Sequence, residues 1–319
     1  MSHLQAFMPP YPLNTAVLFL VFNRLETTRQ VFEAIRQAKP PRLYIAADGP
    51  RENRADEIKK VKAVRDYVMA YIDWDCEVKT LFRDTNLGCK HAVSEAITWF
   101  FEQEEQGIIL EDDCLPSQSF FWYCEDLLEK YKNDDSVYLI SGYGRGSEPF
   151  IKNADYGFCK YALIWGWASW AKVWEKYDPE MSDWPKLSKN IIHNVSKRSV
   201  AKRYWTEAFS LTYKHEIDTW DYQLHYLLVK NGGKSVVPRL NLISNIGFGT
   251  DATHTFDINS ENANRRTYDF SFPIKSEPDR DSKFSIDDFY DRYEFSKKTF
   301  IVRAINKISR LVFGKNFFR

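Results

Sequence analysis

The order of strand and helix signals predicts an α/β fold with a mostly parallel central sheet flanked by helices. Over the first third of the chain, short apolar runs typical of buried strands alternate with longer stretches of helical periodicity. Three of the first four runs end in polar, acidic or glycine-bearing turns, which is where open parallel sheets bind their ligands. At 319 residues the chain is long enough for one large domain.

The first 117 residues are predicted to hold four strands with three helices between them. The strands are expected at 16–22, 43–47, 77–82 and 108–110, and the helices at 26–38, 55–71 and 90–102. Thr27 or Thr28 is the expected cap of the first helix, and Pro40 closes it. Repeated strand–helix–strand units imply parallel strands joined by right-handed crossovers.

The second half of the chain is less regular. Helices are expected at 119–132, across the acid-free basic stretch 186–203 and up to about Val229, and a strand is expected at 137–140. No internal repeat and no low-complexity linker interrupts it. We therefore expect an N-terminal tail at 1–14 and a single domain at 15–280, whose halves cover about 15–117 and about 118–280. A basic segment at 281–319 follows.

Composition argues against several classes of protein. Lys+Arg and Asp+Glu balance at 44 each, so no nucleic-acid partner is expected. The five cysteines form no CxxC pair, which argues against a disulfide framework or a zinc site and for a reducing compartment. No secretory signal and no run near the ~20 apolar residues of a membrane span is present. A cytoplasmic location is expected.

The most informative segment is 107–117, GIILEDDCLPS. Glu111, Asp112 and Asp113 follow directly on a short apolar strand, so they lie at the rim of the predicted sheet. Mg²⁺ and Mn²⁺ prefer oxygen ligands and are often shared between one or two carboxylates and substrate phosphates. The segment predicts a metal–diphosphate site; the alternative is a triplet of solvated loop charges. No GxGxxG and no P-loop occurs.

Six blocks in a fixed order give the chain a family resemblance. They are VFNRLETTRQVF, IAADGPR, GIILEDDCLPS, IWGWASW, TWDYQL and GFGTDATHTF, spread over about 17–256. Together they resemble the GT-A glycosyltransferases, a Rossmann-like fold, and within them the inverting N-acetylglucosaminyltransferase I-like family and related bacterial sugar transferases. The resemblance implies a catalytic domain whose first half binds the nucleotide sugar and whose second half binds the acceptor.

The resemblance also implies roles for single residues. Asn23, Arg24 and Asp48 would hold the nucleoside, although the family usually has an acid where this chain has Asn23. Glu111 and Asp112 would lie beside the donor, and Asp113 would be the direct metal ligand.

Two later blocks match the family's segments for the catalytic base and for closure over the donor diphosphate. The Trp-Asp pair of the family matches Trp220-Asp221, which makes Asp221 the candidate catalytic base. Its alternative role is to cap the helix that follows. The Gly-Phe-Gly block resembles a segment that closes over the diphosphate, which makes His254 a candidate metal or phosphate ligand. Alternatively, His254 is a hydrogen-bonded loop residue.

Three further candidates come from their positions at turns or in an aromatic cluster. Arg83 and Asn86 follow the third strand; Arg83 suits a phosphate fork, with a surface salt bridge as the alternative for it and for Arg24. Trp167 belongs to a tryptophan cluster that forms either a sugar platform or part of the core.

The implied function is a metal-dependent inverting glycosyltransferase. It would use Mn²⁺ or Mg²⁺ and a nucleoside diphosphate sugar, with UDP as the favoured nucleotide, and it would act on a glycan or lipid-linked acceptor in bacterial surface polysaccharide synthesis. A sugar-nucleotide pyrophosphorylase is an alternative, but its glycine- and lysine-rich loop is missing near the N-terminus. A non-catalytic sugar-binding or scaffold relative is another, but the carboxylates are all present.

The C-terminal segment predicts where such an enzyme works. After Glu294 the chain has no acid and seven basic residues. Residues 300–313 place apolar side chains on one helical face and Arg303, Lys307 and Arg310 on the other. A basic amphipathic helix of this kind binds anionic membrane interfaces, so peripheral contact with the inner face of the cytoplasmic membrane is expected. The alternative is a helix packed on the domain.

Overall fold

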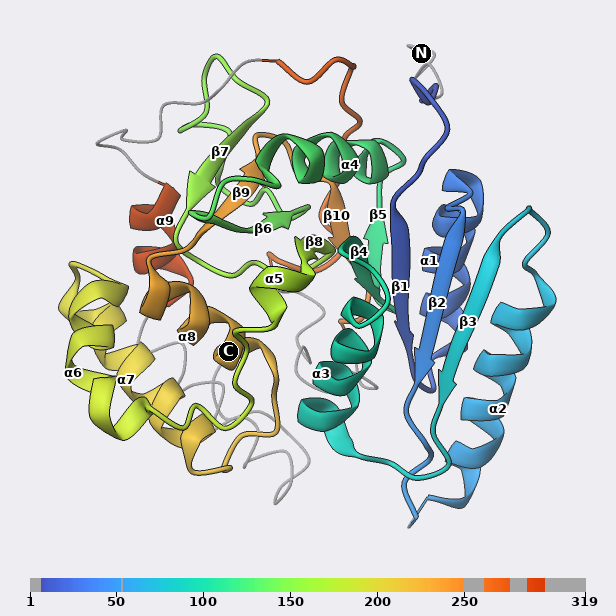
Figure 1. Ribbon diagram of the computed structural model, residues 1–319, viewed down its shortest axis with the longest axis horizontal. Helices are drawn as coiled ribbons and strands as arrows, with labels where there is room; N and C mark the ends of the chain where they lie inside the picture. Colours follow the sequence, from blue (N-terminus) through green and yellow to red (C-terminus); the bar gives the residue numbers. More distant parts are fainter. Residues whose placement is uncertain (1–6, 53, 249–260, 276–285, 296–319) are drawn as a thin grey trace.

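The computed structural model describes residues 7–52, 54–248, 261–275 and 286–295 (Figure 1). Its centre is an eight-stranded sheet with the order β3-β2-β1-β4-β8-β6-β9-β7. The strands are β1 Ala16–Val21, β2 Arg42–Ala47, β3 Glu77–Phe82, β4 Gln106–Glu111, β6 Val137–Ser141, β7 Tyr156–Cys159, β8 Trp167–Trp170 and β9 Lys234–Pro238. A second sheet pairs β5 (Cys114–Pro116) with β10 (Ile243–Asn245).

Helices flank this sheet. They are α1 Leu25–Ala38, α2 Ala55–Ala70, α3 Gly88–Phe101, α4 Ser119–Tyr131, α5 Ala171–Trp174, α6 Trp184–Val195, α7 Ser199–Tyr213, α8 Asp221–Asn231 and α9 Ile286–Tyr293. Strands β3, β2, β1, β4, β6 and β9 run in one direction, while β8 and β7 run against them. The predicted fold class, α/β with a mostly parallel sheet between helices, is therefore confirmed.

The first half folds as its apolar pattern predicts. All six residues of β1 are buried, because helices cover both faces of a parallel sheet. Strand β1 pairs with β2 on one side and β4 on the other, and Phe19 lies level with Ile45 and Leu110. Helices α1 and α2 pack on each other, and α3 packs on β1, β2 and β4 (Figure 1). Strand order reverses between β1 and β4, which is the switch point where open sheets bind ligands.

The start of α1 differs from the prediction. Neither Thr27 nor Thr28 caps it; the cap position is Arg24, which makes no side-chain capping bond. Both threonines lie inside the helix, and the Thr28 hydroxyl donates to the Arg24 carbonyl oxygen at 2.6 Å. The helix starts earlier than expected because that carbonyl also accepts the first helical bond, from the Thr28 amide at 3.0 Å. Arg24 is thereby held at the switch point.

The second half extends the sheet and adds a helical layer. Helices α6, α7 and α8 pack together beside β7 and β9, around a second apolar cluster that includes Trp205 and Phe209. The basic stretch predicted as one helix over 186–203 is two helices. Ser196 adopts an extended backbone, and its hydroxyl accepts the Arg198 amide at 2.9 Å, a local bond that competes with helix continuation.

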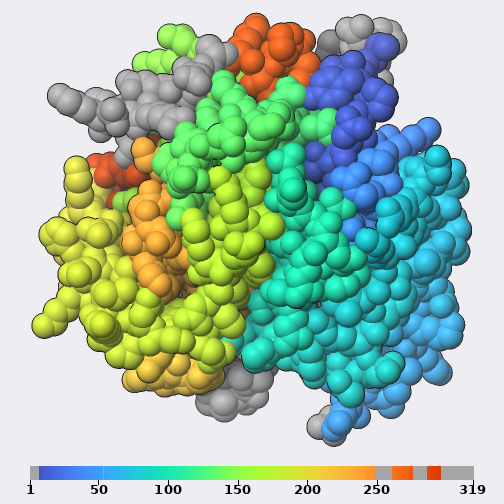
Figure 2. Space-filling model, in the orientation of Figure 1, coloured from blue at the N-terminus to red at the C-terminus, as the bar shows by residue number. Residues whose placement is uncertain are grey.

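The two halves are joined by packing as well as by the shared sheet. Helix α5 contacts α3, and Figure 2 shows this part of the second half, in lime, directly against the teal atoms of α3. No helix within the described ranges is long and apolar enough to cross a membrane. The predicted amphipathic helix at 300–313 lies outside the described residues.

Candidate functional site

The ends of β1 and β4 bring together one cation and two acids. The Arg24 Nη1 atom lies 3.0 Å from the Asp113 Oδ2 atom, and its Nη2 atom donates to the Asp112 Oδ1 atom. Both aspartates are buried, at 3% and 9% exposure. Burial alone would lower the pKa of Arg24, but the charges of the two carboxylates outweigh it and raise that pKa. The guanidinium is therefore always charged, and it is the counter-ion of the acidic pair in this structure.

One oxygen of this cluster lacks a protein partner. The Asp112 Oδ2 atom is buried and accepts no hydrogen bond from the residues that the structure describes. Burial raises the pKa of Asp112, and the charge of Arg24 opposes that rise. A buried carboxylate oxygen without a donor is costly, and a hard cation would satisfy it.

The donor set fits a cation that is completed by its substrate. Within the described ranges, no group of three or more His, Cys, Asp or Glu side chains is arranged to hold a metal ion. Asp112 and Asp113 offer carboxylate oxygens, and Mg²⁺ or Mn²⁺ commonly takes one or two of these with water and phosphate oxygens as the rest. The residues present therefore fit such an ion. His254, the other predicted ligand, lies outside the described residues.

Glu111 links this pair to the candidate base. Burial, then Asp113, Asp112 and Asp221, raise the pKa of Glu111 to about 8, while Arg24 opposes them. Glu111 is consequently protonated over most of the neutral range. The charges of Asp113, Asp112 and Asp221 all act on Glu111, so the start of α8 lies near the end of β4. These four acids are called the acidic cluster below.

The carboxylate of Asp221 does not cap α8. The cap position is Trp220, without a side-chain capping bond, and Asp221 is the first helical residue. The Thr219 hydroxyl donates to the Asp221 carboxylate. Trp220 is anchored by stacking on Trp167, with ring centroids 5.7 Å apart, and by the Tyr177 hydroxyl, which donates to its carbonyl oxygen at 2.9 Å. The capping alternative for Asp221 is therefore not observed.

Asp48 and Asn86 meet at the ends of β2 and β3. The Asn86 amide nitrogen donates to the Asp48 Oδ2 atom at 2.8 Å, and the backbone amides of Gly49 and Leu87 donate to Oδ1 at 2.9 and 3.0 Å. Burial raises the pKa of Asp48 even though these backbone bonds favour its ionised form. Two predicted site residues thus hold a single loop in place.

Asn23 and Arg83 bond to neighbouring helices. The Asn23 amide nitrogen donates to the buried Glu57 at 2.9 Å, and Glu57 also pairs with Arg51. Arg83 donates to Glu95 at 3.2 Å and to the Ala92 carbonyl oxygen at 3.3 Å, both on α3. For Arg83 the structure shows the alternative interpretation, an ion pair.

Trp167 belongs to the core. It is 1% exposed and stacks on Trp220, so it offers no open ring face to a sugar. The sequence allowed this outcome, and the prediction of Trp167 as a nucleotide-sugar contact is corrected. The reason is that β8 is an interior strand between β4 and β6, with helices α4 and α5 packed on it, and all four of its residues are buried. Trp165, half-buried, instead meets Tyr143 and Phe248 edge-on at 4.7 and 5.9 Å.

Two residues near the cluster, Cys89 and Asp218, belong to none of the six sequence blocks. Burial and then the charges of Glu111, Asp221, Asp218 and Asp48 raise the pKa of Cys89, so its thiol lies among these acids. The Asp218 carboxylate accepts the amides of Cys89 and Lys90 at 3.0 and 2.8 Å, which ties the loop before α8 to the start of α3. The only sequence signal was the Asn-Leu-Gly turn, where Gly88 adopts a φ of +79°.

Gly247, the first residue of the Gly-Phe-Gly block, also lies beside the aspartate pair. A Cβ atom on it would lie 2.2 Å from the Asp113 Oδ2 atom and 2.8 Å from the Arg24 Nη1 atom. The neighbouring Ile246 amide donates to the Asp113 carbonyl oxygen at 2.8 Å. The segment after β10 therefore lies directly on the ion pair, and only glycine permits this approach.

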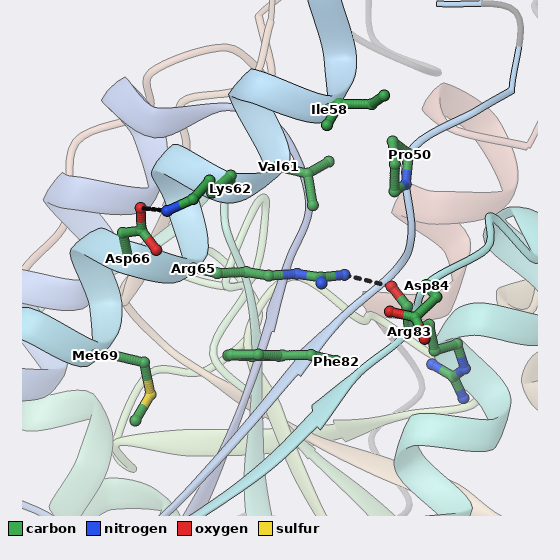
Figure 3. A pocket seen from close by; sticks show the side chains of 10 residues that line it. All are labelled: Pro50, Ile58, Val61, Lys62, Arg65, Asp66, Met69, Phe82, Arg83 and Asp84. Atoms are coloured by element: carbon green, nitrogen blue, oxygen red, sulfur yellow. Dashed lines mark hydrogen bonds and ion pairs between the residues drawn. The ribbon is translucent and has the colours of Figure 1, made fainter. Parts of the chain in front are cut away.

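A separate pocket of about 390 Å³ lies between α2 and the end of β3 (Figure 3). Figure 3 shows the Arg65 side chain over the Phe82 ring, at 5.0 Å from guanidinium carbon to ring centroid, with its guanidinium toward the loop of Arg83 and Asp84. It donates to the Arg83 and Asp48 carbonyl oxygens at 2.6 and 3.1 Å. Arg65 thus ties together the strand ends that carry Asp48 and Arg83.

Comparisons with known proteins give only distant similarities. No family model and no curated protein matches the chain. Among solved structures, the glycosyltransferase GlyE of Streptococcus pneumoniae TIGR4 is 14% identical, covering 70% of this chain and 45% of that chain, with a TM-score of 0.35. Mouse xyloside xylosyltransferase 1 is 10% identical, covering 68% and 81%, with a TM-score of 0.33. An apo UDP-glucose pyrophosphorylase is 8% identical, covering 72% and 93%, with a TM-score of 0.36.

Proposed function

We propose that this chain is a metal-dependent, inverting glycosyltransferase with a GT-A arrangement, which transfers a sugar from a nucleoside diphosphate donor, UDP in the first instance. The observation that carries the proposal is the acidic cluster at the sheet's switch point. It combines a buried aspartate pair, one of whose oxygens has no partner among the described residues, with a second carboxylate, that of Asp221, which does not cap α8. Displacement of a diphosphate from an anomeric carbon needs both parts.

The chain's residues divide the chemistry between them. Asp112 and Asp113 would hold Mn²⁺ or Mg²⁺, which supplies charge neutralisation to the departing diphosphate. Asp221 accepts the proton of the acceptor hydroxyl while that oxygen forms a bond to the anomeric carbon and the bond to the diphosphate oxygen breaks. Attack by one nucleophile on the face opposite the leaving group inverts the anomeric configuration.

Glu111 reduces the negative charge that an incoming diphosphate meets. Its pKa of about 8 means that it is mainly protonated at pH 7. A fully ionised Glu111, Asp112 and Asp113 would carry three negative charges against the single positive charge of Arg24. Protonated Glu111 leaves two, which the guanidinium and one divalent cation more than balance.

The acceptor is proposed to be a glycan or a lipid-linked glycan of bacterial surface polysaccharide synthesis, reached from the cytoplasmic face of the membrane. Support comes from the basic, acid-free chain after Glu294 and from the place where the described part ends. Phe295 packs on Trp205 at 4.7 Å between ring centroids, so the tail leaves from the helical layer of the second half. A polybasic amphipathic segment attached there would hold the domain at an anionic surface.

Phosphorus NMR tests the reaction class. The chain is incubated with UDP-sugars, Mn²⁺ and a membrane lipid extract as acceptor source. We expect release of UDP that requires Mn²⁺ and is lost in Asp221→Asn. Formation of UTP and sugar 1-phosphate on addition of pyrophosphate would instead identify a pyrophosphorylase. Binding without any turnover of any donor would favour a non-catalytic relative.

A further inference from the structure

Arg24 contacts one oxygen of each of the two aspartates that would hold a metal ion. Its Nη1 and Nη2 atoms contact Asp113 Oδ2 and Asp112 Oδ1 respectively, so one guanidinium bridges the whole aspartate pair. The backbone of Arg24 is fixed separately, through the Thr28 amide and hydroxyl that donate to its carbonyl oxygen. The side chain can therefore change partner without loss of the start of α1.

Charge balance shows when such a change is favourable. Arg24, Asp112 and Asp113 together carry a formal charge of minus one. A divalent cation alone would make this buried group plus one, and it would compete with the guanidinium for the same oxygens. The diphosphate of a nucleotide sugar brings two negative charges, which returns the total to minus one. Buried charges are stable only when paired, so the cation and the diphosphate should arrive together.

We propose that Arg24 is an exchangeable counter-ion. It holds Asp112 and Asp113 in the ligand-free chain and turns to the donor diphosphate when the metal takes its place. Metal binding and diphosphate binding are then positively coupled through this one side chain, and by linkage each strengthens the other equally. The inference rests on the proposed function, because it assumes that the site takes a metal and a nucleoside diphosphate.

Gly247 leaves room for this exchange. A side chain there would meet the Arg24 Nη1 atom at 2.8 Å. With glycine, residue 247 places no side chain against the guanidinium. Arginine suits both partners because its planar fork matches carboxylate and phosphate oxygens alike.

The test compares Mn²⁺ alone with UDP in the presence of Mn²⁺, by calorimetry, for the wild type and Arg24→Gln. Because the guanidinium no longer competes for the aspartate oxygens, Arg24→Gln should bind Mn²⁺ alone at least tenfold more tightly than the wild type. The same variant should bind UDP with saturating Mn²⁺ at least tenfold more weakly, because the diphosphate has lost its arginine. A purely structural role for Arg24 would weaken both affinities.

Two further variants complete the design. Arg24→Lys keeps one positive charge beside the aspartate pair and should fold even if Arg24→Gln does not. Like Arg24→Gln, it should bind Mn²⁺ alone more tightly and UDP with Mn²⁺ more weakly than the wild type, but by smaller factors. Arg29→Gln is the matched control, since Arg29 is half exposed on α1, where it pairs with Glu26 and lies over the Tyr67 ring; it should change neither affinity.

Two results would contradict the inference in different ways. Equal or weaker binding of Mn²⁺ alone by both Arg24 variants, with UDP binding intact in the wild type, would overturn the counter-ion role and leave the proposed function standing. No binding of Mn²⁺ by any variant, with or without UDP, would overturn the metal site of the proposed function and this inference with it.

Discussion

The Arg24 Nη1 atom and the Asp113 Oδ2 atom lie 3.0 Å apart although 89 residues separate them in sequence. They meet because β1 and β4, which precede them, are parallel neighbours at the centre of the sheet. The pair is largely buried, with 22% and 12% of the side-chain surfaces exposed. Buried ion pairs contribute little net stability, because the cost of removing both charges from water offsets their attraction.

Asp221 is predicted to be the catalytic base. Asp221→Asn keeps the size of the side chain and the hydrogen bond from Thr219, but it cannot accept a proton at neutral pH. We expect the rate of sugar transfer to fall by ~10²–10⁴ while donor affinity is retained, since that is the usual contribution of a general base. Kinetics with a fixed donor would measure the fall, and proton NMR of the product would give the anomer. A retained anomeric configuration would refute the mechanism.

Gly247 is predicted to be required for the site but not for the fold. In Gly247→Ala the new Cβ atom would lie 2.2 Å from the Asp113 Oδ2 atom and would push the carboxylate away. Mn²⁺-dependent UDP binding should therefore weaken at least tenfold. Gly232→Ala is the matched control. Gly232 has nothing within 4 Å of a Cβ atom but a φ of +68°, so it should lose about 1 kcal/mol of stability and no affinity. Equal UDP affinity in Gly247→Ala and wild type would contradict the geometry.

The burial of His225 predicts how stability depends on pH. His225 is 2% exposed, its Nε2 atom has no partner among the described residues, and burial lowers its pKa well below 6.5. At acidic pH the unfolded chain therefore binds one more proton than the folded chain. This contribution to stability is complete above about pH 6.5 and is lost on acidification, by up to ~1.4 kcal/mol for each pH unit.

Urea unfolding at pH 5 and pH 7 measures this contribution. His225→Gln should lose less stability between the two values than the wild type, because glutamine does not titrate and can still accept the Ala162 amide. His193→Gln is the control, since His193 is exposed on α6 and should leave the pH dependence unchanged. An identical pH dependence in wild type and His225→Gln would rule out the assignment.

The membrane prediction concerns the chain beyond the described residues. A truncation after Phe295 removes seven basic residues. It keeps the Phe295 ring, which packs on Trp205 and Tyr161. Full-length protein should sediment with anionic vesicles at low salt, with each basic residue near the surface adding ~1 kcal/mol. The truncated chain should stay in the supernatant. Sedimentation of both chains to the same extent would show that the tail is not a membrane anchor.

The sequence predicted the first half of the fold well because its signals are local. The runs at β1, β2 and β4 are apolar, short and bounded by turns, and their order alone implies a parallel sheet. The same logic placed Asp48, Asp112 and Asp113 at one rim. The helix break at Ser196 was missed because one hydroxyl-to-amide bond decides it within a stretch that has ordinary helical composition.

The rest of the site depends on contacts between distant segments. Trp220, which precedes Asp221, stacks on Trp167 of strand β8, and no local pattern in the sequence encodes that contact. Cys89 and Asp218 were missed for the same reason, since they meet across 129 residues. Trp167 was misassigned because a tryptophan in a core and one on a binding surface look alike in sequence.

The most direct measurement of the central claim is a thermal-shift panel of nucleoside diphosphate sugars, each with and without Mn²⁺. A ligand that binds only the folded state raises the melting temperature. We predict that at least one donor stabilises the wild type only with Mn²⁺. Asp113→Ala should retain its own melting transition and lose that shift, while Asp66→Ala, an exposed control on α2, should keep it. The absence of any shift with any donor, or an equal shift in Asp113→Ala, would contradict the account.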